Sequence, residues 1–81
     1  MNSTIVRIIF GKKFRAVIRK RDLYGITYSY RIFRPNDRKK TTVEADSDIA
    51  TIDDAEAAAK SAMWRLGETK IFNNTARLIR G

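Results

Sequence analysis

The chain has 81 residues, of which 43% are hydrophobic, so it is the size of one domain (residues 1–81) and too apolar to be a disordered basic tail. It contains no cysteine and no histidine, which excludes disulfides, thiolate chemistry and the usual zinc and copper ligands, and we expect a cytoplasmic protein without a cofactor. The net charge of +8 is uneven, because residues 1–40 hold twelve Lys and Arg against two Asp, whereas residues 41–68 hold two against seven Asp and Glu. One surface of the folded domain should therefore attract polyanions.

Alternating polar and apolar residues in the first half of the chain predict β-strands. Residues 4–10 are β-branched and aromatic, and Gly11-Lys12-Lys13 suits a hairpin leading to a second strand over 14–20. A turn at 21–25 precedes the clearest strand, 26–33, and a charged loop containing Pro35 separates that strand from a shorter one over 41–45. Arg7 interrupts the apolar start and no small-residue cleavage site follows, so we expect neither a signal peptide nor a membrane span.

A helix is predicted between residues 52 and 66. Thr51 can cap its start, acidic residues occupy its first turn, and Gly67 can end it. Apolar side chains recur at helical spacing on one face: Ile52, Ala55, Ala59, Ala62, Met63 and Leu66. After the helix, residues 70–72 and 75–79 are predicted as strands around an Asn73-Asn74 turn. The whole pattern predicts an α+β domain of order β-β-β-β-α-β, in which one helix packs on one face of an antiparallel sheet of four to five strands.

Strand alternation also predicts which side chains the helix leaves uncovered. If the helix covers the face with Phe14, Ala16, Ile18, Ile26, Tyr28, Tyr30 and Ile32, the other face carries Arg15, Arg19, Thr27, Ser29, Arg31 and Phe33. Guanidinium groups and hydroxyls bind phosphate and base edges, and an exposed Phe can stack on a base. The cations expected in the connecting loops would contact the phosphates of a nucleic-acid backbone: Lys12, Lys13, Arg38, Lys39 and Lys40.

We therefore expect a nucleic-acid-binding protein, with DNA preferred over RNA. Several alternatives remain open at this point. Basic side chains can simply solvate an open sheet face and block edge pairing. The same Arg-rich face would suit a small regulatory or inhibitory protein, perhaps encoded by a phage, that binds an acidic protein partner or forms a homodimer through an edge strand. Tyr28 and Tyr30 would become stacking residues if the two faces were exchanged, although we favour core packing.

Trp64 and the acidic residues are the remaining candidates. Trp64 lies away from the apolar stripe of the helix, so it can be a partner anchor, but we favour packing under the C-terminal segment against Phe72 or Leu78. The run ADSDIATIDD lacks the glycine and spacing of a calcium loop, so its carboxylates are better explained by helix capping. No set of nucleophile, base and orienting residue can be built without histidine or cysteine, and no Gly-rich phosphate loop is present. Catalysis through carboxylates with Lys or Tyr stays open, but no motif indicates it, so we expect no enzyme.

The segments KFRAVIRKR, ITYSYRIF and TIDDAEAAAKSAM, within residues 12–66, resemble the three-stranded-sheet-plus-helix DNA-binding domains of plant AP2 factors and phage integrase N-terminal arms. The resemblance implies a sheet lying in the DNA major groove, with Arg15, Arg19 and Arg31 on bases and phosphates. Small phage or prophage accessory proteins share this pattern. The helix is also similar to the last helix of double-stranded-RNA-binding domains, but Asp53-Asp54 replaces that family's basic helix start. The first strand and the ending TARLIRG depart from the AP2 pattern.

Overall fold

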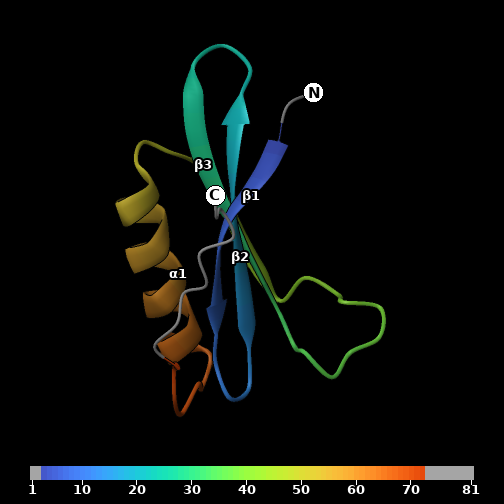
Figure 1. The fold of residues 1–81 in the computed structure, drawn as a ribbon. Coiled ribbons are helices and arrows are strands. Elements are labelled where there is room, and N and C mark those ends of the chain that lie inside the picture. The colour runs from blue at the N-terminus through green and yellow to red at the C-terminus, as the bar shows by residue number, and fades with distance from the viewer. Residues whose placement is uncertain (1–2, 73–81) are drawn as a thin grey trace.

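The computed structural model describes residues 3–72. They form four strands and one helix: β1 (Ser3–Phe10), β2 (Arg15–Asp22), β3 (Ile26–Phe33), β4 (Glu44–Ile49) and α1 (Ile52–Arg65). The strands pair antiparallel in the order β1-β2-β3-β4, and α1 lies against one face of the sheet (Figure 1). The α+β class and the strand order expected from the sequence are confirmed.

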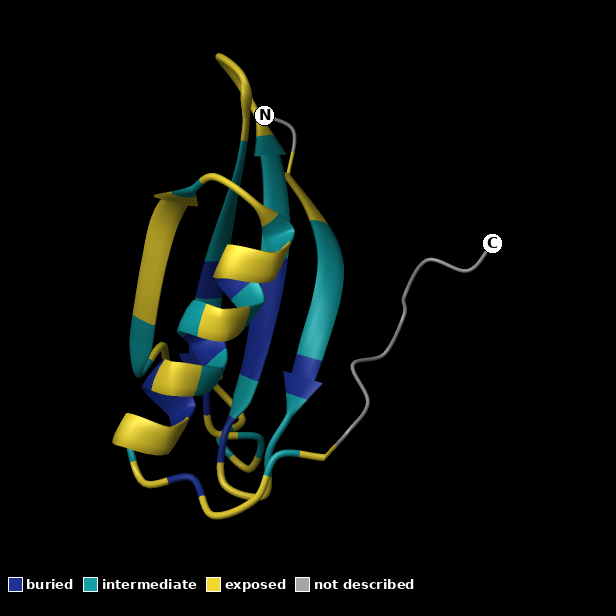
Figure 2. Ribbon diagram, turned by 90° about the vertical axis from the view of Figure 1, so that its left-hand side faces the viewer, coloured by how far each residue is buried: buried dark blue, intermediate teal, exposed yellow. Residues whose placement is uncertain are grey.

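The core lies between α1 and the central strands. Ala16 pairs with Ile32, and Ile18 pairs with Tyr30, on the face that α1 covers. Three of these residues are fully buried and Tyr30 is 6% exposed. Figure 2 shows the buried inner side of α1 turned toward the sheet and its exposed side turned to solvent. The face assignment made from alternation is therefore correct for β2 and β3.

Helix α1 begins and ends as its sequence predicts. The Thr51 hydroxyl oxygen accepts the backbone N–H of Asp54 at 3.0 Å, which satisfies one of the free donors of the first turn. Gly67 follows the helix with φ of +110°, a conformation that only glycine adopts without strain. The helix side chains that face the sheet are fully buried: Ala55, Ala59, Ala62 and Met63. Three of the four are alanines, which lets the helix approach the sheet closely.

The strand predicted over 41–45 lies three to four residues further along, as β4. In the preceding loop, residues 34–43, the backbone N–H of Thr41 donates to Asp37 and is not available to the sheet, and pairing with β3 starts with the Val43 N–H, which donates to the Ile32 carbonyl at 2.7 Å. Both oxygens of Asp37 accept backbone N–H groups, from Lys39 and Thr41, each at 3.0 Å. These N–H donors, that of Thr41 first, lower the pKa of Asp37.

The two segments expected as strands after α1 have different outcomes. Residues 70–72 extend the sheet only by an isolated antiparallel bridge between Ile71 and Gly11, flanked by hydrogen bonds from Lys12 N–H to the Lys70 carbonyl (2.9 Å) and from Phe72 N–H to the Phe10 carbonyl (2.7 Å). The predicted strand 75–79 lies outside the described residues.

A buried carboxylate fixes the turn after α1 to the connection between β1 and β2. Glu68 is 6% exposed, and its oxygens accept backbone N–H groups from both segments: Lys13, Phe14, Thr69 and Lys70. Burial raises the pKa of Glu68, but these donors outweigh it and hold the pKa below its usual range. Gly11 leaves the necessary space, since a Cβ there would clash with the Glu68 carboxylate and lie 2.7 Å from Met63 Cε.

Within residues 3–72, no helix has the length and apolar character needed to cross a membrane.

Candidate functional site

The sheet surface turned away from α1, called here the open face, carries the arginines singled out in the sequence. Arg15, Arg19 and Arg21 all lie at odd-numbered positions of β2, whose side chains point to this face. Arg31 lies on the neighbouring strand β3. Cross-strand pairing sets their surroundings. The paired rows on this face are Phe10–Arg15–Phe33, Ile8–Val17–Arg31, Ile5–Arg19–Ser29 and Arg21–Thr27.

Arg15 lies between two aromatic residues. Its guanidinium carbon is 4.9 Å from the centre of the Phe10 ring, a cation–π distance. Its Nε is buried and has no hydrogen-bond partner among the described residues. Arg15 therefore has a donor that the described protein atoms do not satisfy, together with terminal nitrogens that can bind an anion.

Arg31 has a structural role as well. Its Nε donates to the Thr42 hydroxyl at 2.6 Å, and its Nη2 donates to the Lys40 carbonyl, so it holds the end of the 34–43 loop on β3. Arg31 and Lys40 also lie over the Phe33 ring, at 5.2 and 5.5 Å from its centre. Phe33 is only 4% exposed for this reason. The prediction of an exposed Phe33 on this face was wrong, because alternation gives the face of a side chain but not what covers it.

The side chains of Arg19 and Arg21 form no hydrogen bond or ion pair with the described residues. They line a shallow cavity of about 400 Å³ together with Ser29, Arg31 and Asp46, and Asp46 forms no ion pair with the described arginines. Sequence reasoning placed Arg21 in a turn, but β2 runs on to Asp22 and puts Arg21 opposite Thr27. The signal was available, since Arg15, Arg19 and Arg21 all occupy odd positions of one alternating strand.

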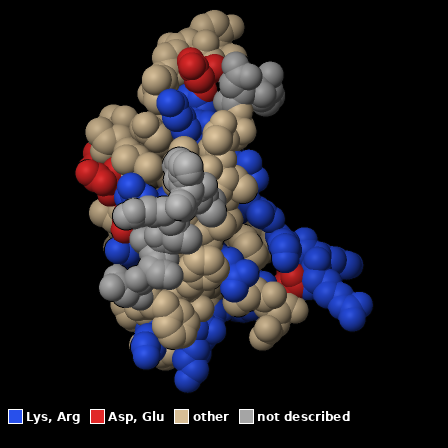
Figure 3. All heavy atoms as spheres, in the orientation of Figure 1, with Lys and Arg blue, Asp and Glu red and all other residues tan. Residues whose placement is uncertain are grey.

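The acidic residues neutralise cations on the α1 side. Arg7 pairs with Glu56, Lys60 Nζ lies 2.8 Å from Glu56, and Arg65 makes a bidentate pair with Glu44 at 3.0 and 3.1 Å. Among residues 3–72, no ion pair includes an arginine of the open face. Figure 3 shows Lys and Arg side chains along the side of the molecule away from α1 and out along the loop that follows β3. The positive charges of the open-face arginines are thus not paired with carboxylates of the described residues.

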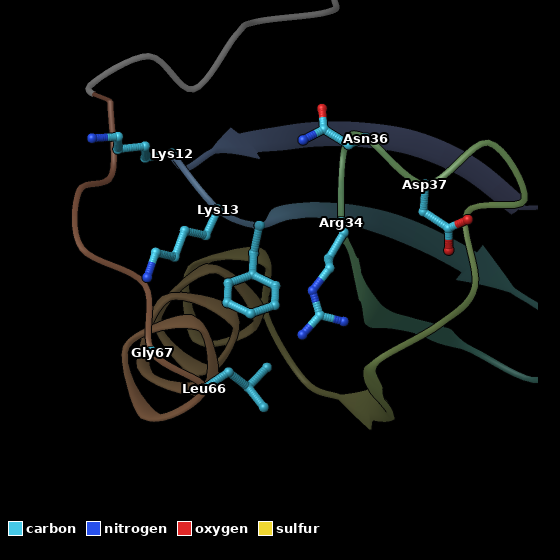
Figure 4. A pocket seen from close by; sticks show the side chains of 8 residues that line it. Lys12, Lys13, Arg34, Asn36, Asp37, Leu66 and Gly67 are labelled. Atoms are coloured by element: carbon cyan, nitrogen blue, oxygen red, sulfur yellow. The ribbon is translucent and has the colours of Figure 1, made fainter.

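The basic loops lie at one end of the sheet. Lys12 and Lys13 are exposed between β1 and β2, and with Arg34 and Asp37 they line a cavity of about 550 Å³ (Figure 4). Arg34 lies over the Phe14 ring at 5.2 Å, and the side chain of Lys13 extends toward the chain just after α1. The other predicted loop cations are also exposed, in the 34–43 loop: Arg38, Lys39 and Lys40.

The aromatic candidates separate into core and surface. Tyr30 packs in the core, as favoured from the sequence, and its hydroxyl donates to Glu44 at 3.2 Å. Trp64 is 50% exposed, and most of the C-terminal segment under which it was expected to pack lies outside the described residues. The inner side of α1 is occupied by alanines and Met63, which leaves Trp64 on the outer side. Of its two expected neighbours, Phe72 is 41% exposed and Leu78 lies outside the described residues.

Trp64 is the only tryptophan, so its fluorescence tests this placement. We expect red-shifted emission from the free protein and ready quenching by acrylamide, because half of the side chain contacts water. Sedimentation in the same buffer should accompany the measurement, since a dimer that covers Trp64 would shift the emission to the blue. A blue-shifted, protected Trp64 in a monomer would contradict the structure.

In the part of the chain that the structure describes, no three Asp or Glu residues gather in a way that could hold a metal ion. Comparisons with protein-family models, with curated proteins and with solved structures found no match.

Proposed function

We propose that the protein binds nucleic acid, with duplex DNA preferred, through the open face and the basic loops at its end. The observation that carries the proposal is the segregation of ion pairs. Acidic residues neutralise Arg7, Lys60 and Arg65 beside α1, while the open-face arginines have no carboxylate partner among residues 3–72. A sheet surface with several unneutralised guanidinium groups attracts phosphates and releases their counterions on binding.

The arrangement of aromatic side chains favours a duplex over a single strand. Single-strand binding relies on aromatic rings with a free face on which bases stack. On the described open face, Phe33 is 4% exposed and Phe10 lies under the Arg15 guanidinium. What the open face does offer is guanidinium and hydroxyl groups, which suit phosphate oxygens and base edges.

Groove dimensions favour DNA over duplex RNA. The major groove of B-form DNA is about 12 Å wide and admits secondary structure, whereas that of A-form RNA is too narrow for side chains to read. A surface built on neighbouring strands therefore has better access to base edges in DNA. The resemblance of residues 12–66 to three-stranded-sheet-plus-helix DNA-binding domains supports the same choice.

Fluorescence anisotropy with labelled duplex DNA, single-stranded DNA and duplex RNA of one length tests the proposal. We expect micromolar or tighter binding to duplex DNA in roughly 0.1 M salt, and binding to the single strand weaker by about tenfold or more. Equal affinity for all three probes would contradict the preference for duplex DNA. Weaker than micromolar affinity for every probe, even at low salt, would reject nucleic-acid binding altogether.

A second candidate function is binding to an acidic protein partner, as a small regulatory or inhibitory protein. The exposed Trp64 favours it, because tryptophan is enriched among residues that dominate binding energy at protein interfaces. This candidate becomes the better one if no nucleic-acid probe binds while Trp64 is accessible in the free monomer. In that case, the open-face arginines would pair with carboxylates instead of phosphates.

A further inference from the structure

The hairpin that joins β2 and β3 ends in exposed apolar side chains. Leu23 is 61% exposed, Tyr24 is 97% exposed and Ile26 is 49% exposed. The turn is closed by a hydrogen bond from Leu23 N–H to the Gly25 carbonyl at 3.3 Å, and Gly25 has φ of +130°. Figures 1 and 2 both show this hairpin extending beyond the N-terminal end of α1. All three side chains lie outside the buried core, and Tyr24 in particular gains little from packing within the fold.

The tip continues the basic open face. Arg19 and Arg21 lie on the open face on the way to the tip, and Lys20 lies between them on the opposite face. Arg21 also borders a small cavity of about 170 Å³ with Leu23, Tyr24 and Asp48. Only Asp22 separates Arg21 from Leu23, so an apolar end lies close to cations that can bind phosphate. Proteins that insert apolar side chains between base pairs combine such cations with an apolar wedge.

The length of the β2–β3 hairpin places its tip, Leu23 and Tyr24, beyond the DNA groove that the open face would cover. The middle of the open face is the row of Val17 and Arg31, and Tyr24 lies seven residues further along the chain. At about 3.3 Å per residue, the tip is roughly 20 Å from that row. Adjacent grooves of B-form DNA are separated by about half of a ~34 Å helical turn, so a hairpin running across the groove reaches the next one.

We propose that Leu23 and Tyr24 insert into the groove of duplex DNA adjacent to the one covered by the open face, where they unstack a base step and bend the duplex. This inference rests on the proposed function, because the arginines bring the tip to the DNA. The two contributions are separable, since the arginines supply charge and the tip supplies apolar contact.

The test compares the wild type with the double variant Leu23→Ser/Tyr24→Ser on a duplex containing 2-aminopurine, with dyes at the two ends for energy transfer. Wild type should raise 2-aminopurine fluorescence and shorten the distance between the ends. The double variant should lose both signals and bind about tenfold more weakly, because apolar burial is lost. The dependence of its affinity on salt should stay unchanged, because no charge is removed.

Trp64→Ser is the matched control, since it removes another exposed aromatic side chain, from α1, and should change none of these readouts. The double variant should fold as the wild type does, because Tyr24 is 97% exposed and has little packing to lose. If wild type binds DNA but the double variant binds and bends it equally, the wedge is rejected while the proposed function stands. If wild type does not bind DNA, both fail. The insertion proposal would also be rejected if wild type, but not the double variant, bound phosphatidylserine vesicles while wild type did not bend DNA.

Discussion

Replacing Arg19 and Arg21 with glutamate is expected to weaken binding to duplex DNA by about 100-fold or more in roughly 0.1 M salt. Each lost phosphate contact removes a counterion-release contribution of nearly tenfold at this salt, and each new carboxylate repels the phosphates. These two residues are the best choice on the open face because the side chain of neither makes a hydrogen bond or ion pair with the described residues. The measurement is an anisotropy titration beside a thermal unfolding curve.

The matched control compares two double variants that each lower the net charge by two, on opposite sides of the molecule. Arg19→Gln/Arg21→Gln removes two positive charges from the open face. Ala57→Glu/Ser61→Glu adds two negative charges at exposed positions of α1. We expect the first pair to weaken binding by tens of fold and the second by only a few fold, because screening at this salt limits the effect of distant charge. Equal losses would show that only net charge matters.

Replacing Glu68 with alanine is expected to lower the free energy of unfolding by roughly 3 kcal/mol, a large share of the stability of a domain this small. The substitution leaves four backbone N–H groups without their acceptor: those of Lys13, Phe14, Thr69 and Lys70. Urea unfolding at neutral pH measures the loss. Asp53→Ala is the control, since its side chain is 90% exposed and its one ion pair within residues 3–72, with Arg7, spans 3.7 Å. A loss for Glu68→Ala no larger than for Asp53→Ala would contradict this role.

The same carboxylate predicts an effect of pH on stability. Its pKa in the folded protein lies below the ordinary value of 4.5, so its stabilising contribution is complete above that value and is lost as the pH falls through the folded pKa. Wild type should therefore lose stability below about pH 5. The Glu68→Gln variant should lose less stability over that pH range. Part of the pH dependence of stability should remain, because Glu44 and Glu56 also have lowered pKa values.

Local patterns in the sequence were sufficient to predict the sheet and helix. Alternation assigned Ala16, Ile18, Tyr30 and Ile32 to the covered face because strand side chains must point to opposite sides. Capping chemistry identified Thr51 as the start of α1 because few residue types can satisfy the free N–H groups there.

Features that depend on contacts between distant segments could not be predicted in this way. The burial of Phe33 depends on Arg31 and Lys40 lying over its ring, and the role of Glu68 depends on a loop more than fifty residues away. The start of β4 was misplaced because Asp37 and Arg31 hold the preceding loop through hydrogen bonds that residue propensities do not contain. Arg21 was omitted from the candidate site only because the turn was placed too early.

The salt dependence of binding to duplex DNA tests the central claim most directly. If the open face and its loops neutralise about five phosphates, the logarithm of the association constant should fall with the logarithm of salt concentration with a slope of roughly −4 to −5. Arg19→Gln/Arg21→Gln should reduce this slope by about two units, whereas Ala57→Glu/Ser61→Glu should leave it unchanged. A wild-type slope near zero, or a slope that the open-face pair does not reduce, would contradict binding through the arginines of this face.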